Sequence, residues 1–343
     1  MPFDLMSLVE TMRRDPFALD ADLEVPSENQ AVGYEDFDQP GYRFVERGFW
    51  SKLPKVGDLF FAVRLMLAVR KTQALLLNQV DRCAQWACLI NGLLGRPKKI
   101  VLYDVFFSTP SAFRRRVVQR MVEGATWNVV FSEAQVVGFA REFGLPETRF
   151  VHVPYQSSHS KRPPLAEPVG DYVWAGGNSA RDYRTLIEAV KGTGIPVQIT
   201  STLPELATLA AGVSEVTLAP AHEPEFTELM ARSRFVVLPL AEGRVRGYGE
   251  QTILNSWWHG QAVLALDDVS AGDYVGGSGG GEVLNPGDVD GLRSLLQAWW
   301  ADAEGTRTCG RAGQSWVAAR YTHDHFKRRM VAVTRLCAGL TAP

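Results

Sequence analysis

No apolar run in this 343-residue sequence approaches the roughly 18 residues that a membrane-spanning helix needs. The most apolar helix candidate, near residues 59–69, is interrupted by Arg64. The first four residues lack the basic start and the apolar run of a secretory signal. The chain has only four cysteines, at Cys83, Cys88, Cys309 and Cys337. They show no CxxC or other metal-ligand spacing, so we expect a soluble cytoplasmic protein with reduced thiols.

Neither sign of charge dominates the sequence. Lys and Arg number 36 against 38 Asp and Glu, which gives a formal net charge of −2 and excludes broad electrostatic binding to nucleic acid. One basic amphipathic run covers residues 113–122 and contains Arg114, Arg115, Arg116 and Arg120. Two interpretations of this run stay open: a solvated helix face, or a peripheral contact with anionic lipid at the inner membrane face.

Several catalytic motifs are missing, namely HExxH, the P-loop, GxSxG and a complete GxGxxG. Three Asp-x-Asp pairs occur, and the pair at Asp288 and Asp290 follows a Pro-Gly turn, which is typical of helix capping. His323 and His325 are two residues apart in a predicted helix, so they point to different faces and make poor joint metal ligands. We therefore expect no metal site.

The chain is longer than the roughly 250 to 300 residues at which a single core stops growing, so we expect two domains. From residue 42 onward, short apolar runs alternate with longer amphipathic runs, which is the pattern of β-α-β units and parallel sheets. The predicted strands are 42–45, 74–77, 99–103, 127–131, 150–153, 172–175, 196–200, 213–218, 235–239 and 262–266. The predicted helices are 58–70, 82–94, 111–123, 133–143, 181–190, 223–231, 250–259, 288–300, 304–319 and 323–338.

The polar, proline-broken stretch between Pro154 and Pro168 is the clearest linker in the chain. We therefore predict an N-terminal α/β domain at 1–155, whose first 40 residues are irregular and acidic, and a linker at 156–168. A second α/β domain follows at 169–322. Residues 323–343 form a C-terminal helix that could pack back toward the N-terminal domain.

One candidate binding segment follows the predicted strand 172–175. Gly176, Gly177 and Asn178 stand between this strand and the next helix. Glycines let the backbone approach a ligand closely, and a helix N-terminus offers free N–H groups to a phosphate. Arg181 lies in the first helical turn, where the helix dipole disfavours a cation, which indicates an external anion. The alternative is an ordinary β-α turn with a solvated arginine.

A second candidate segment follows the predicted strand 235–239. Gly247 and Gly249 allow a tight turn onto the helix at 250–259, and Gln251 and Thr252 add donors beside its exposed N–H groups. Two basic residues, Arg244 and Arg246, lie just upstream. The alternative is a glycine-rich surface loop with solvated arginines. Because one domain contains two such helix starts, a diphosphate group is the ligand that we predict.

The order of these segments resembles a known signature. Residues 249–265, 273–275 and 281–288 look like the donor domain of the retaining group 1 (family 4) glycosyltransferases, and residues 176–189 resemble the glycine loop and helix of that family. The resemblance covers about the last half of the chain. It implies the GT-B fold, with two Rossmann-like α/β domains that face each other across a cleft. The N-terminal half matches poorly, so we expect an atypical or truncated N-terminal domain.

The resemblance also implies roles for individual residues. Arg181 stands where the family keeps a basic residue on the donor diphosphate, and Arg244 or Arg246 would replace a second basic residue that is missing here. Asn255 stands where the family usually has a glutamate that binds the ribose. The other expected donor contacts are Gly176, Gly177, Asn178, Gly249, Glu250, Gln251 and Thr252. Asp104, at the end of the strand 99–103, is the candidate acceptor contact, with a helix-capping role as the alternative.

The resemblance implies transfer of a sugar from a nucleoside diphosphate donor, uridine-linked, with retention and without a metal or other cofactor. The acceptor is unknown and could be a glycan, a lipid-linked molecule or a small molecule. Arg181, Asp104 and Arg246 are the predicted catalytic residues. Two alternatives stay open: a degenerate GT-B protein that serves as a binding or regulatory subunit, and a nucleotide-sugar epimerase.

Overall fold

The structure is a computed structural model that describes residues 15, 17–20, 25–35, 37–49, 53, 55–104, 112–165, 170–267 and 269–339. The chain divides into two compact units. Unit 1 consists of Met1–Pro154 together with Asp324–Pro343, and unit 2 consists of Tyr155–His323. Of the predicted linker, residues 166–168 lie outside the described residues, as does most of the acidic stretch before residue 25.

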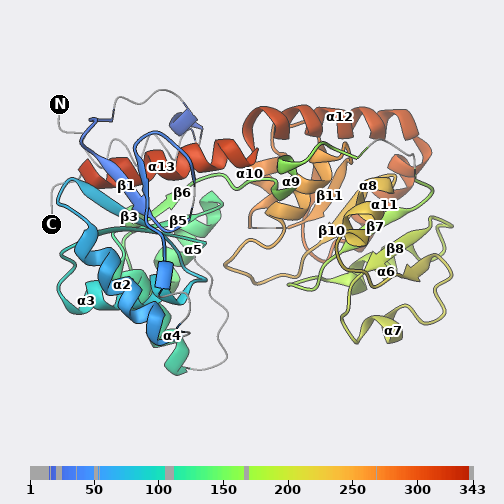
Figure 1. The fold of residues 1–343 in the computed structure, drawn as a ribbon. Helices are drawn as coiled ribbons and strands as arrows, with labels where there is room; N and C mark the ends of the chain where they lie inside the picture. The colour runs from blue at the N-terminus through green and yellow to red at the C-terminus, as the bar shows by residue number, and fades with distance from the viewer. Residues whose placement is uncertain are drawn as a thin grey trace. The chain divides into compact units, whose positions relative to one another are not determined.

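Unit 1 is built on a sheet of six parallel strands in the order β2-β1-β3-β4-β5-β6. The strands are β1 (Gln30–Gly33), β2 (Tyr42–Phe44), β3 (Gln73–Asn78), β4 (Lys99–Tyr103), β5 (Trp127–Val130) and β6 (Phe150–His152). The helices between them are α2 (Val56–Ala68), α3 (Arg82–Leu93), α4 (Ala112–Gly124) and α5 (Glu133–Phe143). Helices α2, α3 and α4 lie together on one side of this sheet (Figure 1).

Strand β1 lies within the first 40 residues, for which we predicted an irregular conformation. It pairs with β3 on one side and with β2 on the other. Its residues from Ala31 to Gly33 are buried on both faces. A buried strand of four residues shows no alternation of apolar and polar side chains, so the sequence pattern did not reveal it.

The other side of the unit 1 sheet is covered by the last helix, α13 (His323–Gly339). The ring of Phe326 packs edge-on against Tyr103 and Phe131, with 6.2 Å between ring centroids in both pairs. Arg329 is fully buried, and its guanidinium forms a two-pronged ion pair with Asp20. Residues from the end of the chain therefore complete the core that residues near its start begin.

Unit 2 is built on a second sheet of six parallel strands, in the order β12-β11-β10-β7-β8-β9. The strands are β7 (Val173–Gly176), β8 (Val197–Thr200), β9 (Val216–Leu218), β10 (Val236–Pro239), β11 (Val263–Leu266) and β12 (Gly281–Leu284). The helices are α6 (Tyr183–Val190), α7 (Leu206–Leu209), α8 (Glu225–Arg232), α9 (Glu250–Trp258), α10 (Ala271–Val275), α11 (Val289–Ala301) and α12 (Ala303–Arg320). Counted from β7, this order is that of the doubly wound Rossmann fold.

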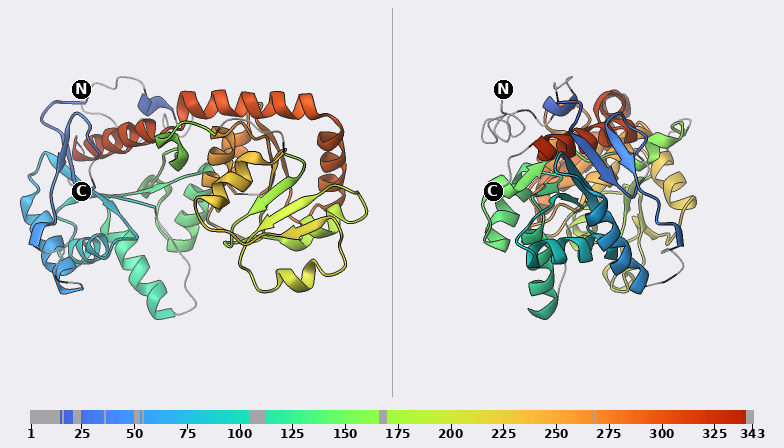
Figure 2. Two further views of the ribbon diagram at one scale, coloured as in Figure 1. Left: turned by 45° about the vertical axis from the view of Figure 1, so that its right-hand side comes forward. Right: turned by 60° about the vertical axis from the view of Figure 1, so that its left-hand side comes forward.

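Two layers of helices enclose the unit 2 sheet. Helix α6 packs beside α11 and α12 packs beside α9, and α9 and α12 lie on the opposite side of the sheet from α6 (Figures 1 and 2). Glycines allow α12 to approach α9 closely. A Cβ atom at Gly310 would lie 2.0 Å from the carbonyl oxygen of Gly260, and one at Gly313 would lie 2.4 Å from the indole of Trp257.

Among the described residues, no helix combines the length and the apolarity needed to cross a membrane. In α4, Arg115 forms an ion pair with Glu142 at 2.7 Å, and Arg120 pairs with Glu123 at 3.0 Å. The side chain of Arg114 lies outside the described residues. The lipid contact stays a prediction.

The close approach of α12 to α9 gives a test of the fold. We expect Gly310→Ala to lower the free energy of unfolding by about 1 to 3 kcal/mol, because the new methyl group meets backbone that cannot move aside. Gly272→Ala in α10 is the control, since a Cβ atom there meets nothing within 4 Å. Urea unfolding followed by circular dichroism measures the free energy of unfolding of both variants. A Gly310→Ala variant as stable as the wild-type protein would contradict the proposed packing.

Candidate functional site

The unit 2 sheet changes its winding direction between β7 and β10. In open α/β sheets, ligands bind at such a point, outside the carboxyl ends of the strands. Strand β7 ends at Gly176 and β10 ends at Pro239. The segments that follow them meet, because Arg181 forms an antiparallel bridge with Leu240. The structure therefore brings together the two segments that the sequence singled out.

Arg181 joins these two segments through its guanidinium. Nε donates to the carbonyl of Gly176 at 2.9 Å, and Nη1 donates to the carbonyls of Ser179 at 2.9 Å and Tyr248 at 3.1 Å. Nη2 donates to the hydroxyl of Thr252 at 3.3 Å. All four acceptors are neutral, and no carboxylate of the described residues forms an ion pair with Arg181.

The guanidinium of Arg181 is half-buried, and no carboxylate of the described residues is hydrogen-bonded to it. Burial lowers the pKa of this guanidinium from the ordinary value. The nearby Arg244 adds to this effect, whereas Tyr183 and the more distant carboxylates of Glu250 and Asp267 oppose it. A cation in this situation is stabilised by an anion from outside the chain.

Three glycines leave the space that this guanidinium and the two turns beside it occupy. Gly177 adopts a left-handed conformation with φ of 101°, and a Cβ atom there would lie 2.9 Å from Nη2 of Arg181. A Cβ atom at Gly176 would overlap the indole of Trp174, and one at Gly249 would lie 2.5 Å from Leu238 in β10. Side chains at these positions would separate the turn, the guanidinium and the start of α9.

The two helix starts at this site differ. Helix α9 begins after Gly249, which has no side chain to cap it, so the first-turn N–H groups of Gln251 and Thr252 have no partner within the helix. Helix α6 is capped, because Asp182 accepts from the backbone N–H of Thr185 at 3.2 Å. We expected an open helix start after Gly177 as well. Of the two, only α9 is uncapped.

The side chain of Asn178 has a structural role, because its hydrogen bonds join two loops of unit 2. Its Oδ1 accepts from the hydroxyl of Ser201 at 2.7 Å and from the backbone N–H of Thr202 at 3.0 Å, and its Nδ2 donates to the hydroxyl of Thr202 at 2.9 Å. These bonds fix the turn after β7 to the end of β8.

The two arginines upstream of α9 have different surroundings. Arg244 forms a buried ion pair with Asp267, with 2.6 Å between Nη2 and Oδ1. Burial by itself raises the pKa of Asp267, but Arg244 and the N–H groups of Ser270 and Ala271 outweigh it and hold the pKa below the ordinary value. Arg246 lies over the ring of Tyr248 at 5.4 Å. Arg246 is thus next to the residue whose carbonyl binds Arg181.

Glu250 folds back over the start of its own helix. Its Oε2 accepts from the N–H of Gly249 at 3.0 Å, while Oε1 is buried with no hydrogen-bond partner among the described residues. Burial raises the pKa of this carboxyl group, and the bond from Gly249 opposes the shift. A raised pKa reduces the negative charge that Glu250 would place near an anion.

Asn255 lies past the first turn of α9. Its amide is engaged by the segment through which the chain enters unit 2: Oδ1 accepts from Ser157 Oγ at 2.8 Å, and Nδ2 donates to Ser158 Oγ at 3.1 Å.

Asp104 belongs to unit 1, where it directly follows β4 with a left-handed φ of 55°. Residues 105–111, which follow it, lie outside the described residues.

Sequence reasoning missed two residues of this site. The hydroxyl of Tyr183 donates to the carbonyl of Gly177 at 2.6 Å, and burial raises its pKa to about 12. Tyr248 contributes its backbone carbonyl, for which no sequence signal exists. Among the described residues, no group of three or more His, Cys, Asp or Glu is arranged to hold a metal ion. Asp288 caps α11 as predicted, since it accepts from the N–H of Gly291 at 2.8 Å.

Comparison with known proteins gives similarity in structure but not in sequence. No protein-family model and no curated protein sequence matches the chain. The sucrose-phosphate synthase of Thermosynechococcus elongatus is similar with a TM-score of 0.60 and 16% identity, over 83% of this chain and 78% of that one. The HepE protein of Anabaena, solved in complex with UDP, is similar with a TM-score of 0.57 and 13% identity, over 94% of this chain and 93% of that one. A glycosyltransferase of Rickettsia africae is similar with a TM-score of 0.57 and 12% identity, over 85% of this chain and 84% of that one.

These similarities confirm the predicted fold class. The chain has the α/β fold of the GT-B glycosyltransferases, with one parallel six-stranded sheet in each unit. Coverage of more than nine-tenths of both chains in the HepE comparison shows that the fold extends through both units. At these identities the similarity concerns the fold alone.

The buried pair of Arg244 and Asp267 supports the loop before α9 and gives a second test. We expect Asp267→Asn to lower the free energy of unfolding at pH 7 by about 3 kcal/mol, because it leaves Arg244 buried without its counter-charge. The stabilisation by Asp267 is complete above the ordinary Asp pKa of about 4 and is lost as the pH falls through its lower folded pKa. The difference in the free energy of unfolding between Asp267→Asn and wild type should therefore become smaller at acid pH.

The control for this variant is Glu304→Gln, which alters the ion pairs of Glu304 with Arg307 and Arg311, in which the Glu304 side chain is 68% exposed. We expect such exposed ion pairs to contribute almost nothing to the free energy of unfolding. Urea unfolding at a series of pH values measures both. If the free energy of unfolding of Asp267→Asn differed from that of wild type by the same amount at all pH values, the negative charge assigned to Asp267 would be contradicted.

Proposed function

We propose that this protein is a glycosyltransferase that moves a sugar from a nucleoside diphosphate donor to an acceptor hydroxyl. The observation that carries the proposal is the guanidinium of Arg181, which is hydrogen-bonded to no carboxylate of the described residues and lies beside the uncapped start of α9 at the switch point of the sheet. A phosphate group is the ligand to which a guanidinium and a helix N-terminus both bind well. The similarity in fold to glycosyltransferases supports the same proposal.

In the proposed reaction, negative charge builds up on the diphosphate as the bond to the sugar breaks. Arg181 and the N–H groups of Gln251 and Thr252 stabilise that charge, and they need little rearrangement because the surrounding bonds already hold them in place. Arg246 is the second cation proposed for the diphosphate, and Gly249 lets it approach the helix start. This positive charge is the reason for proposing a metal-independent reaction. Retention at the sugar is also part of the proposal.

The proposed donor is a UDP-sugar. The structures of HepE with UDP, and with UDP and glucose, support this choice because HepE has the same fold over nearly the whole chain. The acceptor is left as a glycan, a lipid-linked molecule or a small molecule, with Asp104 as the proposed acceptor contact. A cytoplasmic enzyme with peripheral contact to the inner membrane face is the proposed setting.

Binding of UDP tests the diphosphate site. We expect Arg181→Ala to weaken UDP binding by roughly 10- to 100-fold, because hydrogen bonds to charged groups contribute about 1.5 to 3 kcal/mol. Arg184→Ala is the matched control, since Arg184 lies three residues farther along the chain, in the first turn of α6, with an exposed side chain. Arg181 itself precedes α6, although we predicted it in the first turn of that helix. Titration calorimetry measures the dissociation constants. Equal affinity of Arg181→Ala and wild type for UDP would remove the proposed site.

Turnover of nucleotide-sugars tests the reaction. We expect release of UDP from one member of a donor panel, with or without an acceptor mixture, and we expect the rate to be unchanged by EDTA. A rate that EDTA abolishes and Mg²⁺ or Mn²⁺ restores would contradict metal independence. Binding of UDP without any turnover would indicate the regulatory-subunit alternative, and conversion of the donor sugar without an acceptor would indicate an epimerase.

A further inference from the structure

The chain enters unit 2 through residues 155–165, which we call the connector, and the connector lies along helix α9. Two side chains of α9 and that of its C-cap residue, His259, hold it. Asn255 accepts from the hydroxyl of Ser157 at 2.8 Å, and Trp258 Nε1 donates to the carbonyl of Arg162 at 3.0 Å. His259 Nδ1 accepts from the backbone N–H of Leu165 at 3.0 Å. These three residues stand at positions i, i+3 and i+4, so they share one face of the helix.

The bond from Leu165 determines the protonation of the His259 ring. Because Nδ1 accepts, the proton of the neutral ring is on Nε2, which faces Nδ1 of His159 at 3.0 Å. His159 Nδ1 must then accept, so its own proton is on Nε2, which points to the hydroxyl of Thr227 at 3.4 Å. Thr227 in turn donates to the carboxylate of Glu223 at 2.6 Å. Every bond in this series has one donor and one acceptor only if both rings are neutral.

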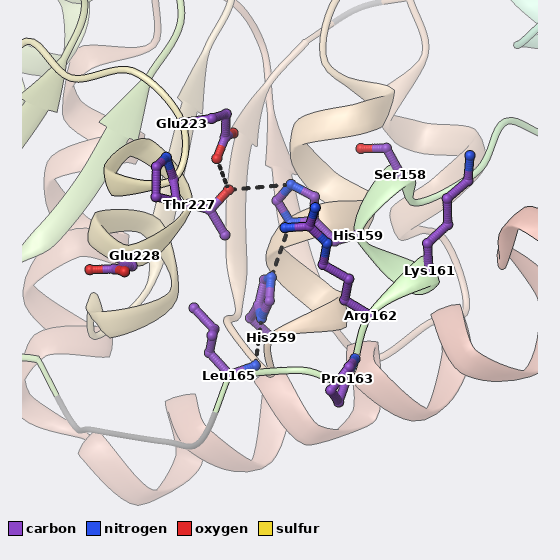
Figure 3. Close-up of a pocket in the computed structure, with 11 residues that line it drawn as sticks. Ser158, His159, Lys161, Arg162, Pro163, Leu165, Glu223, Thr227, Glu228 and His259 are labelled. Carbon is purple, nitrogen blue, oxygen red and sulfur yellow. Dashed lines mark hydrogen bonds between the residues drawn. The ribbon is translucent and has the colours of Figure 1, made fainter.

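Figure 3 shows the two imidazole rings facing each other, with Thr227 of α8 on one side and Leu165 of the connector on the other. An additional proton on His259 Nδ1 would face the N–H of Leu165. An additional proton on His159 Nδ1 would face the N–H of His259. In both cases two donors oppose each other and one bond that holds the connector is lost.

The pair lines a cavity of about 700 Å³, through which water and protons can reach it. Charged side chains of both signs line the same cavity, namely Lys161 and Arg162 from the connector and Glu223 and Glu228 from the region of α8. Burial lowers the pKa of His259 to about 4, and His159 adds to this shift. Burial also lowers the pKa of His159, which Glu223 opposes and Arg162 reinforces.

We propose that His159 and His259 form an acid-sensitive clamp, which fastens the connector to α9 while both rings are neutral and releases it when either ring takes up a proton. The sign follows from the lowered pKa values. A released connector exposes histidines with the ordinary pKa of about 6.5, so the released form binds protons that the fastened form excludes. The fastened form therefore loses stability as the pH falls from about 6.5 toward 4. The clamp involves no nucleotide, so it stands apart from the proposed function.

Hydrogen exchange of the full chain tests the clamp. Protection factors, corrected for the intrinsic effect of pH, are measured by mass spectrometry between about pH 7.5 and 4.5. We expect protection of the connector amides to fall at least roughly tenfold, since each excluded proton changes the equilibrium up to tenfold per pH unit. Strand β7 of the same unit is the reference and should keep its protection. Unit 1 is a poor reference, because burial lowers the pKa of its own His152 to about 4.

Two outcomes of this measurement would overturn the clamp. One is connector protection that does not change over this pH range. The other is a fall that β7 shares, because that result indicates unfolding of the whole unit. A titration of the histidine rings by NMR in the wild-type protein adds an independent readout. Rings that titrate near 6.5 while the connector stays protected would also overturn it.

Variants separate the histidine pair from other acid effects. In the double variant His159→Asn with His259→Asn, each amide oxygen can occupy the place of the accepting Nδ1 but does not titrate in this range. We expect the protection of connector residues 161–165 to be independent of pH in this variant. These residues lie beyond the contacts that His323 makes with Gln156 and Ser160 of the connector. His222→Asn is the control, since His222 is an exposed histidine of the same unit and should leave the wild-type fall unchanged. A double variant with the full wild-type fall would overturn the assignment to these two rings.

Discussion

The guanidinium of Arg181 is the interaction on which the unit 2 site depends. It donates to acceptors as far as 71 positions away in the sequence, and its acceptors in both segments are backbone carbonyls or a hydroxyl. Because these acceptors are neutral, the four bonds fix the geometry of both turns without cancelling the charge. The glycines at positions 176, 177 and 249 are the steric condition for this arrangement, since a side chain at any of them would overlap its neighbours.

Helix α9 serves two purposes at once. Its first turn is uncapped at the candidate site, and a face farther along holds the connector. An amide suits position 255, where the resemblance to the glycosyltransferase signature led us to expect a glutamate. The Asn255 side chain accepts from Ser157 and donates to Ser158, and an ionised carboxylate could not donate. Position 255 thus contributes to holding the connector.

Local sequence patterns predicted much of the fold. The limits of β4 and α5 match the prediction to the residue, because apolar runs of these lengths are bounded by clear turn and capping residues. The meeting of the segments around Gly176 and Thr252 was also predictable, since both follow strands that end at the same edge of a sheet. Side-chain partners from distant parts of the chain were not. Arg244 forms an ion pair with Asp267, and Asn255 accepts a hydrogen bond from Ser157; these pairings depend on which elements become neighbours.

Unit 1 is made from both ends of the described chain, with Arg329 of α13 inserted beside Asp20 and Phe326 against Tyr103. During translation, every residue of unit 2 leaves the ribosome before α13 does. The nascent unit 1 must therefore wait with one face of its sheet uncovered while unit 2 emerges and folds. That interval leaves exposed the apolar surface that Phe326 later covers, so unit 1, although begun first, is the later of the two units to be completed.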